Sequence, residues 1–160
     1  KGKLQMLCRT RNSRIYSSWS TDNGRVWTRL EPTALPNPNS AIDAITMKDG
    51  RHLLVYNHIG ATENQSERNV LNIAVSEDGV NWGAAIMLED DTKLDDDKTL
   101  ILNDVGLIHT DSEYSYPAVI QASDGAIHIT YTWKRESIKQ VVLDPSKLQS
   151  KPMVNGIWPT

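Results

Sequence analysis

Residues 20–27 read Ser20-Thr-Asp22-Asn-Gly24-Arg-Val-Trp27, and residues 76–82 repeat the pattern as Ser76-Glu-Asp78-Gly79-Val-Asn-Trp82, with one residue fewer before the glycine. These residue types suit a tight turn between two strands. Ser and Asp side chains accept hydrogen bonds from backbone N–H groups, Gly adopts a left-handed conformation, and Trp covers the turn with an apolar face. The two segments therefore predict a repeated turn in which Asp22 and Asp78 are structural residues.

A second repeated element is a strand that opens on a glycine. Such segments begin at Gly2, Gly50 and Gly125, and the last two glycines follow Asp49 and Asp124 between apolar runs. Asp-Gly between apolar runs is a strong hairpin signal. Helical periodicity is scarce, whereas short alternating runs bounded by turn residues recur along the chain. The sequence therefore predicts an all-β fold.

The spacing of these glycines favours a propeller repeat, because blades of known propellers run to roughly 40–50 residues and tolerate long loops. The extra length between Gly50 and Gly125 falls in two polar segments, residues 58–69 and the acidic run 89–98. We expect a single incomplete domain over residues 1–160, with part of a blade at 1–36, blades at 37–96 and 97–145, and a tail at 146–160.

Composition limits the classes of function. The net charge is −3, but residues 1–30 contain seven Lys and Arg against one Asp, a local excess that suits an anionic ligand. A nucleic-acid partner is disfavoured, since the pI of about 5.8 is unlike that of such proteins. No apolar stretch is long enough to span a membrane, and no metal-ligand spacing or cofactor motif occurs, so we expect neither metal nor cofactor.

Together, the two turn motifs, the Asp-Gly hairpins and the run Tyr114-Ser-Tyr116-Pro-Ala-Val-Ile-Gln-Ala-Ser-Asp124-Gly125 resemble the sialidase (neuraminidase) family of BNR/Asp-box propellers. The resemblance implies about three blades of a six-bladed β-propeller with Asp-box hairpins. It also implies a fragment of an exo-glycosidase that hydrolyses terminal sialic acid or a related acidic sugar. Without its first blades, the fragment is expected to be inactive alone.

Members of this family hold the sugar carboxylate with three arginines, because a guanidinium pairs with a carboxylate through two parallel hydrogen bonds. The resemblance places the second arginine a few residues before an Asp-box, where Arg14 matches best and Arg11 comes next. It places the third before the strand that enters the next box, which indicates Arg68. The alternative for all three is an ordinary solvated side chain.

The family's nucleophile is a tyrosine eight residues before the Asp of the Asp-Gly turn, which points to Tyr116. Tyr114 is the rival because it is followed by Ser, as the family's tyrosine is. A strand tyrosine that faces a core is the alternative for either. The glutamate that the resemblance predicts after Tyr131 is replaced by Thr132. This departure keeps two further readings open: a propeller that binds a glycan without cleaving it, or a related enzyme acting on another sugar.

The expected partners are a glycan or acidic sugar, together with either a second copy of the chain or missing N-terminal blades, since a partial propeller leaves sheet edges exposed. The sequence does not decide the compartment, and the resemblance implies a secreted or periplasmic protein.

Overall fold

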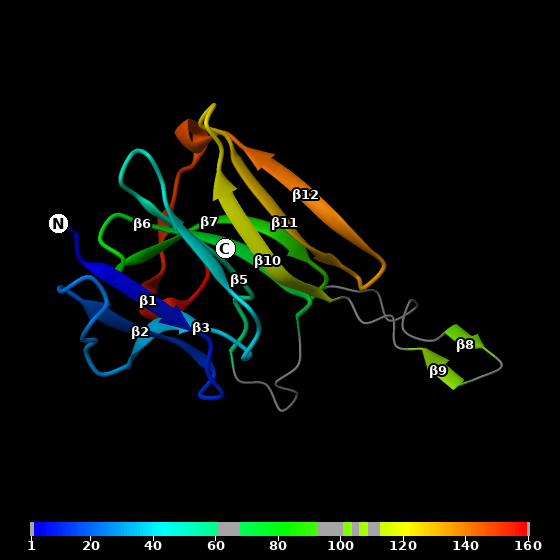
Figure 1. The fold of residues 1–160 in the computed structure, drawn as a ribbon. Helices are drawn as coiled ribbons and strands as arrows, with labels where there is room; N and C mark the ends of the chain where they lie inside the picture. The colour runs from blue at the N-terminus through cyan, green and yellow to red at the C-terminus, as the bar shows by residue number, and fades with distance from the viewer. Residues whose placement is uncertain (1, 61–67, 93–100, 104–105, 109–112, 160) are drawn as a thin grey trace.

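The structure is a computed structural model that describes residues 2–60, 68–92, 101–103, 106–108 and 113–159. Its described part is built almost entirely from antiparallel strands, which confirms the all-β prediction (Figure 1). Residues 93–98 of the acidic run, residues 61–67 of the preceding loop and the expected blade boundary at 97 lie outside the described residues.

Three sheets follow one another along the chain. The first sheet has the order β1-β2-β3, formed by Leu4–Cys8, Arg14–Ser20 and Glu31–Pro36. The second sheet has the order β13-β7-β6-β5-β4, formed by Lys151–Pro152, Trp82–Asp90, Val70–Ser76, His52–Tyr56 and Asp43–Thr46. The third sheet has the order β10-β11-β12, formed by Tyr114–Gln121, Ile127–Trp133 and Ser137–Leu143.

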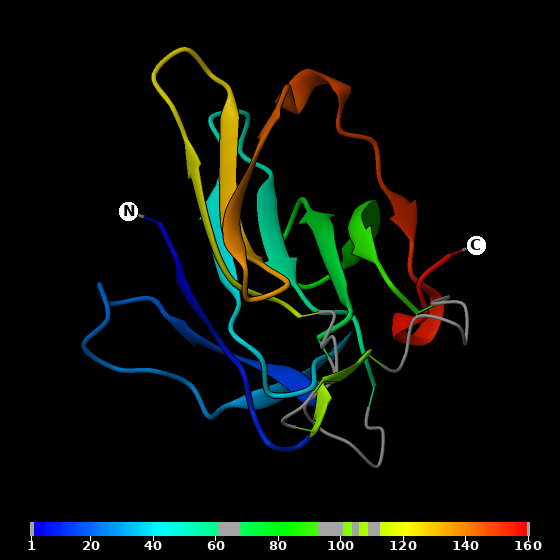
Figure 2. The same ribbon diagram turned by 90° about the vertical axis from the view of Figure 1, so that its right-hand side faces the viewer.

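A separate two-stranded ladder pairs β8 (Ile101–Asn103) with β9 (Gly106–Ile108). The C-terminal tail carries two short 3₁₀ helices, η2 (Pro145–Lys147) and η3 (Val154–Gly156), on either side of β13. In Figure 2 the tail, drawn in red, runs beside the green strands of the second sheet. The residues expected to form a tail thus add a fifth strand to the middle sheet.

The expected hairpins are present at both Asp-Gly pairs. Gly50 N donates to Met47 O at 2.9 Å, Gly125 N donates to Ala122 O at 3.1 Å, and both glycines have positive φ, 92° and 96°. The strands that follow are β5 and β11, so the alignment of the glycine-opened strands is also confirmed. The same meander in successive sheets is the arrangement expected for part of a propeller.

Both predicted Asp-box turns form. The Asp22 carboxylate accepts hydrogen bonds from Arg25 N and Val26 N, and Asp78 accepts from Val80 N and Asn81 N. These bonds favour the ionised form and hold the pKa of both carboxyl groups below its usual range. The two tryptophans differ: Trp27 is half-buried over its own turn, whereas Trp82 begins β7 and is buried in the core.

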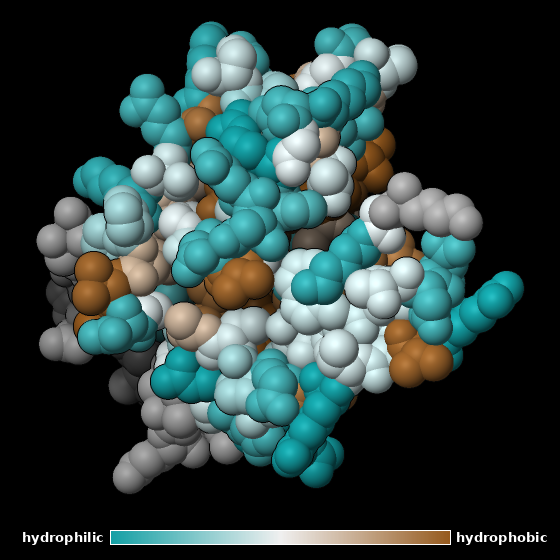
Figure 3. All heavy atoms as spheres, turned by 90° about the vertical axis from the view of Figure 1, so that its left-hand side faces the viewer, coloured by the Kyte–Doolittle hydropathy of each residue, from teal (hydrophilic) through white to brown (hydrophobic). Residues whose placement is uncertain are grey.

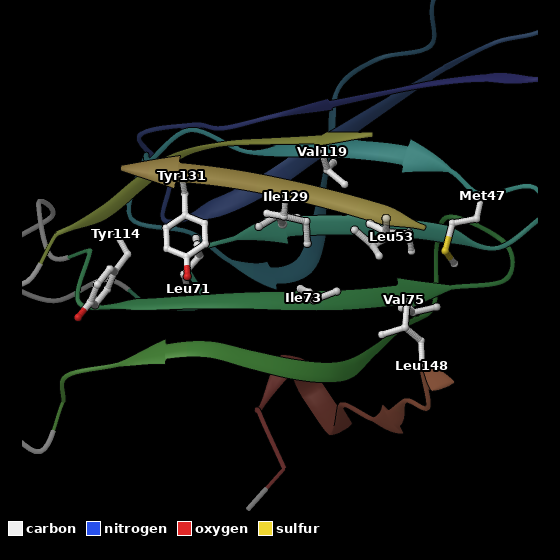
Figure 4. Packing of buried hydrophobic residues seen from close by; sticks show 12 residues of the cluster. Met47, Leu53, Leu71, Ile73, Val75, Tyr114, Val119, Ile129, Tyr131 and Leu148 are labelled. Carbon is white, nitrogen blue, oxygen red and sulfur yellow. The ribbon is translucent and has the colours of Figure 1, made fainter. Parts of the chain in front are cut away.

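Two apolar layers hold the sheets together. Between the second and third sheets, aliphatic side chains of β5 and β6 meet those of β10 and β11, as Figure 4 shows for Leu53, Ile73 and Ile129. Between the first and second sheets, Ile15 and Leu35 meet Leu54 and other buried residues. Because β5 and β6 are buried on both faces, their sequences are nearly continuous apolar runs.

Candidate functional site

The strand directions give each sheet two distinct ends with different sets of turns. Successive strands are antiparallel, so the Asp-Gly turns and the Asp-box turns share one end, and the starts of β2, β6 and β10 lie at the other. Contacts between sheets agree: Lys48 N donates to the Gln121 side chain at the Asp-box end, and Asn57 Nδ2 donates to Tyr114 O at the opposite end. Arg14, Arg68 and Tyr114 therefore all stand at or next to strand starts on the end opposite the Asp-boxes.

At that end the structure brings Arg68 and Tyr116 together. The Arg68 guanidinium carbon lies 5.6 Å from the centroid of the Tyr116 ring, within the range of a cation–π contact. Arg68 O also accepts a hydrogen bond from Tyr114 N at 2.8 Å, which ties the segment before β6 to the start of β10. Tyr116 is 60% exposed and has φ 52°, so it is open to solvent and held in a conformation that tyrosine rarely adopts.

A buried carboxylate, Glu113, organises the neighbouring charges. Its two oxygens accept from Arg68 Nη1 at 3.0 Å and from Arg135 Nε at 2.5 Å, and Ser115 Oγ adds a third hydrogen bond at 2.6 Å. Burial by itself would raise the pKa of Glu113, but the Ser115 and Arg135 bonds and the charge of Arg68 outweigh it and lower the pKa. Glu113 therefore stays ionised and fixes both guanidinium groups.

Tyr114, the rival of Tyr116, points into the layer between the second and third sheets (Figure 4). It is 1% exposed, and its hydroxyl donates to Asp91 Oδ2 at 2.6 Å. Tyr131 lies in the same layer and donates to Glu89 Oε1 at 2.5 Å. Burial, and then the adjacent carboxylates, raise the pKa of both phenols, so each is a neutral donor in this arrangement.

Arg14 and Arg11 belong to the first sheet and its β1–β2 turn. The Arg14 guanidinium donates to Ala34 O on β3 at 3.1 Å, and both arginines are exposed. In the described part of the chain, no hydrogen bond or ion pair joins Arg14 or Arg11 to Arg68 or Tyr116. The structure thus assembles Arg68 and Tyr116 into one cluster and leaves Arg14 and Arg11 on the neighbouring sheet at the same end.

The sequence reasoning did not select several members of this cluster. They are Glu89, Asp91, Glu113, Tyr131, Lys134 and Arg135. One signal was available: Glu113 directly precedes the strand that carries both tyrosine candidates. Lys134 and Arg135 lie in a turn between two alternating strands, where cations are ordinarily read as solvated.

Elsewhere in the described residues we looked for a metal site, a membrane-spanning helix and a hollow lined by the candidate residues. They contain no cluster of His, Cys, Asp and Glu side chains that could hold a metal ion. Among them, no helix is long and apolar enough to cross a membrane. Hollows of about 470 and 640 Å³ border the first and second sheets, and none of the candidate residues lines either one. On the side of the molecule that carries the N-terminus, apolar atoms are visible in a hollow among hydrophilic ones (Figure 3).

Comparisons with known proteins agree with this fold. The BNR repeat-like domain matches residues 1–129. The leech intramolecular trans-sialidase, solved with 2,7-anhydro-Neu5Ac, superposes with a TM-score of 0.60 at 16% identity over 92% of this chain and 22% of that chain. The intramolecular trans-sialidase from Ruminococcus gnavus, solved with oseltamivir carboxylate, gives 0.59 at 18% identity over 95% of this chain and 32% of that chain. No curated protein sequence matches.

At these identities the likeness to the two trans-sialidases shows the fold, and this chain spans between about a fifth and a third of their length. The domain match covers most of the 160 residues and includes both Asp-box turns, the first sheet and strands β4 to β7 of the second sheet. The chain therefore belongs to the BNR repeat-like domain family and has the fold of part of a sialidase-like β-propeller.

Proposed function

We propose that this chain is part of a sialidase-like exo-glycosidase and contributes one side of a site for a terminal acidic sugar. The observation that carries the proposal is the pairing of Arg68 with the exposed ring of Tyr116 at the end of the sheets opposite the Asp-boxes. A guanidinium supplies the charge that a sugar carboxylate requires, and an exposed phenol beside it can reach a sugar ring bound there. The two solved structures named above are trans-sialidases, and one holds a sialic acid derivative.

In this proposal Arg68 binds the carboxylate, Arg14 and Arg11 approach it from the first sheet, and Tyr116 stands at the anomeric carbon. A neutral nucleophile suits a reacting carbon that bears a carboxylate, because a carboxylate nucleophile would be repelled. The phenol, whose usual pKa is near 10, needs a base to accept its proton as it attacks. The expected blades 1–36, 37–96 and 97–145 would then act as parts of one larger propeller.

A second function, binding without hydrolysis, is favoured by one specific observation. Within the described residues, the tyrosines whose hydroxyls bond to a carboxylate are Tyr114 and Tyr131, and no carboxylate is bonded to the Tyr116 hydroxyl. Loss of a general base commonly costs about 10²–10⁴-fold in rate. We therefore expect this chain to bind an acidic sugar and to hydrolyse sialosides far more slowly than a complete enzyme.

The test is saturation-transfer NMR on the 160-residue chain with N-acetylneuraminic acid and with a neutral hexose, beside a fluorogenic sialoside assay. We expect signals from the acidic sugar alone, an affinity on the order of millimolar, and no measurable turnover. Arg68→Ala and Arg14→Ala should each abolish the signal, and Arg14→Ala should leave the melting temperature nearly unchanged because Arg14 is exposed. Arg25→Ala, at an exposed arginine of the first Asp-box turn, is the matched control.

Two results would count against the proposal. Equal signals for the two sugars would mean that charge does not select the ligand. Rapid turnover of the sialoside would show that this chain already contains a working base for the nucleophile.

A further inference from the structure

The turn between β11 and β12 has an unusual backbone for its sequence. Glu136 N donates to Trp133 O at 3.0 Å, and the two central residues, Lys134 and Arg135, have φ 52° and 54°. A turn with two consecutive positive φ values strongly favours Gly, which has no Cβ to crowd the following carbonyl oxygen, and Asn or Asp, whose short polar side chains hydrogen-bond locally. Two long cations therefore occupy positions that a structural turn alone would not select.

Both cations of this turn reach carboxylates, the half-buried Asp91 and the buried Glu113. Lys134 Nζ lies 3.2 Å from Asp91 Oδ2, and Arg135 Nε donates to Glu113 Oε2 at 2.5 Å. The backbone takes part as well, because Lys134 N donates to Glu113 O at 2.8 Å. These contacts hold the turn against the start of β10 in spite of its strain.

The charges of this cluster do not balance at Glu113. One carboxylate faces two guanidinium groups, Arg68 and Arg135, which leaves one positive charge in excess. The Arg68 side chain is 20% exposed, whereas that of Arg135 is 67% exposed. Arg135 uses Nε for Glu113, and in the described part of the chain its two terminal nitrogens have no hydrogen-bond partner. Two parallel donors are therefore free to bind a further anion.

A third strained residue lies at the same place. Tyr116 has φ 52°, projects its ring into solvent, and lies against Arg68. Strained backbone that persists in a fold gathers at ligand clamps and active sites, where the surrounding contacts fix it. Lys134, Arg135 and Tyr116, the three residues with positive φ around Glu113 and Asp91, present two cationic groups and one aromatic ring to solvent.

We infer that the β11–β12 turn is a ligand-binding element in which Arg135, with Arg68, holds the carboxylate of an acidic pyranose while the ring of Tyr116 packs on the sugar. This inference rests on the proposed function and extends it, because it assigns recognition to Arg135, on the third sheet. Glu113 is a positioning residue that sets the spacing of the two guanidinium groups. Lys134 anchors the turn through Asp91.

The experiment compares Arg135→Gly with the unchanged 160-residue chain, using N-acetylneuraminic acid as the probe in NMR titration and thermal unfolding as the second readout. Gly relaxes the positive φ at this position, which offsets the loss of the Arg135–Glu113 ion pair, so the melting temperature should change little. Loss of the charged donors should weaken binding about tenfold or more. A merely structural Arg135 would give the reverse pattern, with intact affinity and lower stability.

Further variants keep the outcome decisive. Arg135→Gln retains a long side chain and removes the charge, and it should lose affinity as Arg135→Gly does even if the glycine variant folds poorly. Tyr116→Phe should keep the affinity and Tyr116→Ala should lose it, since packing needs the ring and not the hydroxyl. Arg25→Gly is the control for removing an exposed arginine.

The results separate this inference from the function on which it rests. If the unchanged chain binds no acidic sugar, both are overturned. If the unchanged chain binds and Arg68→Ala does not, but Arg135→Gly and Arg135→Gln bind as the unchanged chain does, the proposed function stands and the role of Arg135 is refuted.

Discussion

Replacing Gly156 by alanine should detach the C-terminal tail from the first sheet. Gly156 has φ 74°, and a Cβ added there would lie 2.1 Å from Ala34 O and 3.0 Å from Ala34 C. Both atoms belong to the backbone of β3, so no side chain can rotate to make room. Either β3 or the tail must move, and the tail has fewer contacts to hold it.

The cost has two parts. A positive φ at a residue other than glycine costs about 1–2 kcal/mol. The steric overlap adds roughly 1–3 kcal/mol, the usual cost of overpacking. It disturbs the packing of Met153 against the core between the first and second sheets and the contact of Trp158 with His58, whose ring centroids are 5.2 Å apart. At about 2–4 °C for each kcal/mol in a chain of this size, the melting temperature should fall by roughly 4–20 °C.

Gly50→Ala is the matched control because Gly50 has φ 92° and an added Cβ would meet nothing within 4 Å. Gly50→Ala therefore includes the free-energy cost of a positive φ at alanine but no steric overlap with neighbouring atoms. The measurement is thermal unfolding of both variants followed by circular dichroism, with tryptophan fluorescence to report on Trp158. If Gly156→Ala is destabilised no more than Gly50→Ala, the tail does not depend on its contact with β3 and the reasoning is refuted.

Two further predictions concern pH and the Asp-box. Burial lowers the pKa of His58 to about 4, opposed by a hydrogen bond with Gly156, so the folded chain favours neutral His58. The unfolded chain takes up this proton first, and the free energy of unfolding should therefore decrease as the pH falls from about 6.5 toward 4. Urea unfolding at several pH values should show that the free energy of unfolding depends less steeply on pH in His58→Gln than in the unchanged chain. An equally steep dependence on pH in the variant would contradict the assignment to His58. Asp78→Ala should cost about 1 kcal/mol by freeing the Val80 and Asn81 amides, whereas Glu77→Ala at the exposed neighbouring residue should cost nothing measurable.

The turns could be predicted from the sequence because their stabilising bonds are local. Ser76 Oγ accepts from Gly79 N and donates to Asp78, all within four residues, so a short pattern contains the whole interaction. The different burial of Trp27 and Trp82 depends on tertiary contacts. Trp82 packs with Ile15 and Leu54, which belong to two different sheets.

The candidate tyrosines show where sequence reasoning stops. Residues two apart in a strand share a face, so alternation places Tyr114 and Tyr116 together. In the structure the pairing of β10 with β11 shifts between Ser115 and Ala118, and Tyr116 has a positive φ. This irregularity buries Tyr114 in the layer between sheets and exposes Tyr116. Since only the paired strand reveals a bulge, the sequence alone left the two residues as alternatives.

The charged residues of the cluster escaped prediction for a different reason. Glu113 meets Arg68 across 45 positions, which depends on how the second and third sheets pack. It meets Arg135 across 22 positions, which depends on the pairing of β10 with β11 beyond their register shift. A pattern read along the chain contains no information on which loop ends adjoin. Glu113 and Arg135 could have been proposed only after the order and stacking of the strands were known.

The two ends of the sheets differ in how their polar groups are used. At the Asp-box end, the Asp78 carboxylate is occupied by amides of its own turn, and the required positive φ values fall on glycines such as Gly50 and Gly79. At the opposite end, positive φ falls on Ser13 and Asn39 and also on Tyr116, Lys134 and Arg135, and the positive charge exceeds the carboxylates bonded to it at Glu113. A fold that gains nothing from such strain would replace the last three of these residues with Asn or Gly, as the other end does. This contrast between the two ends of the same strands is the physical ground for the proposal that an anionic ligand binds beside Arg68, Tyr116 and Arg135.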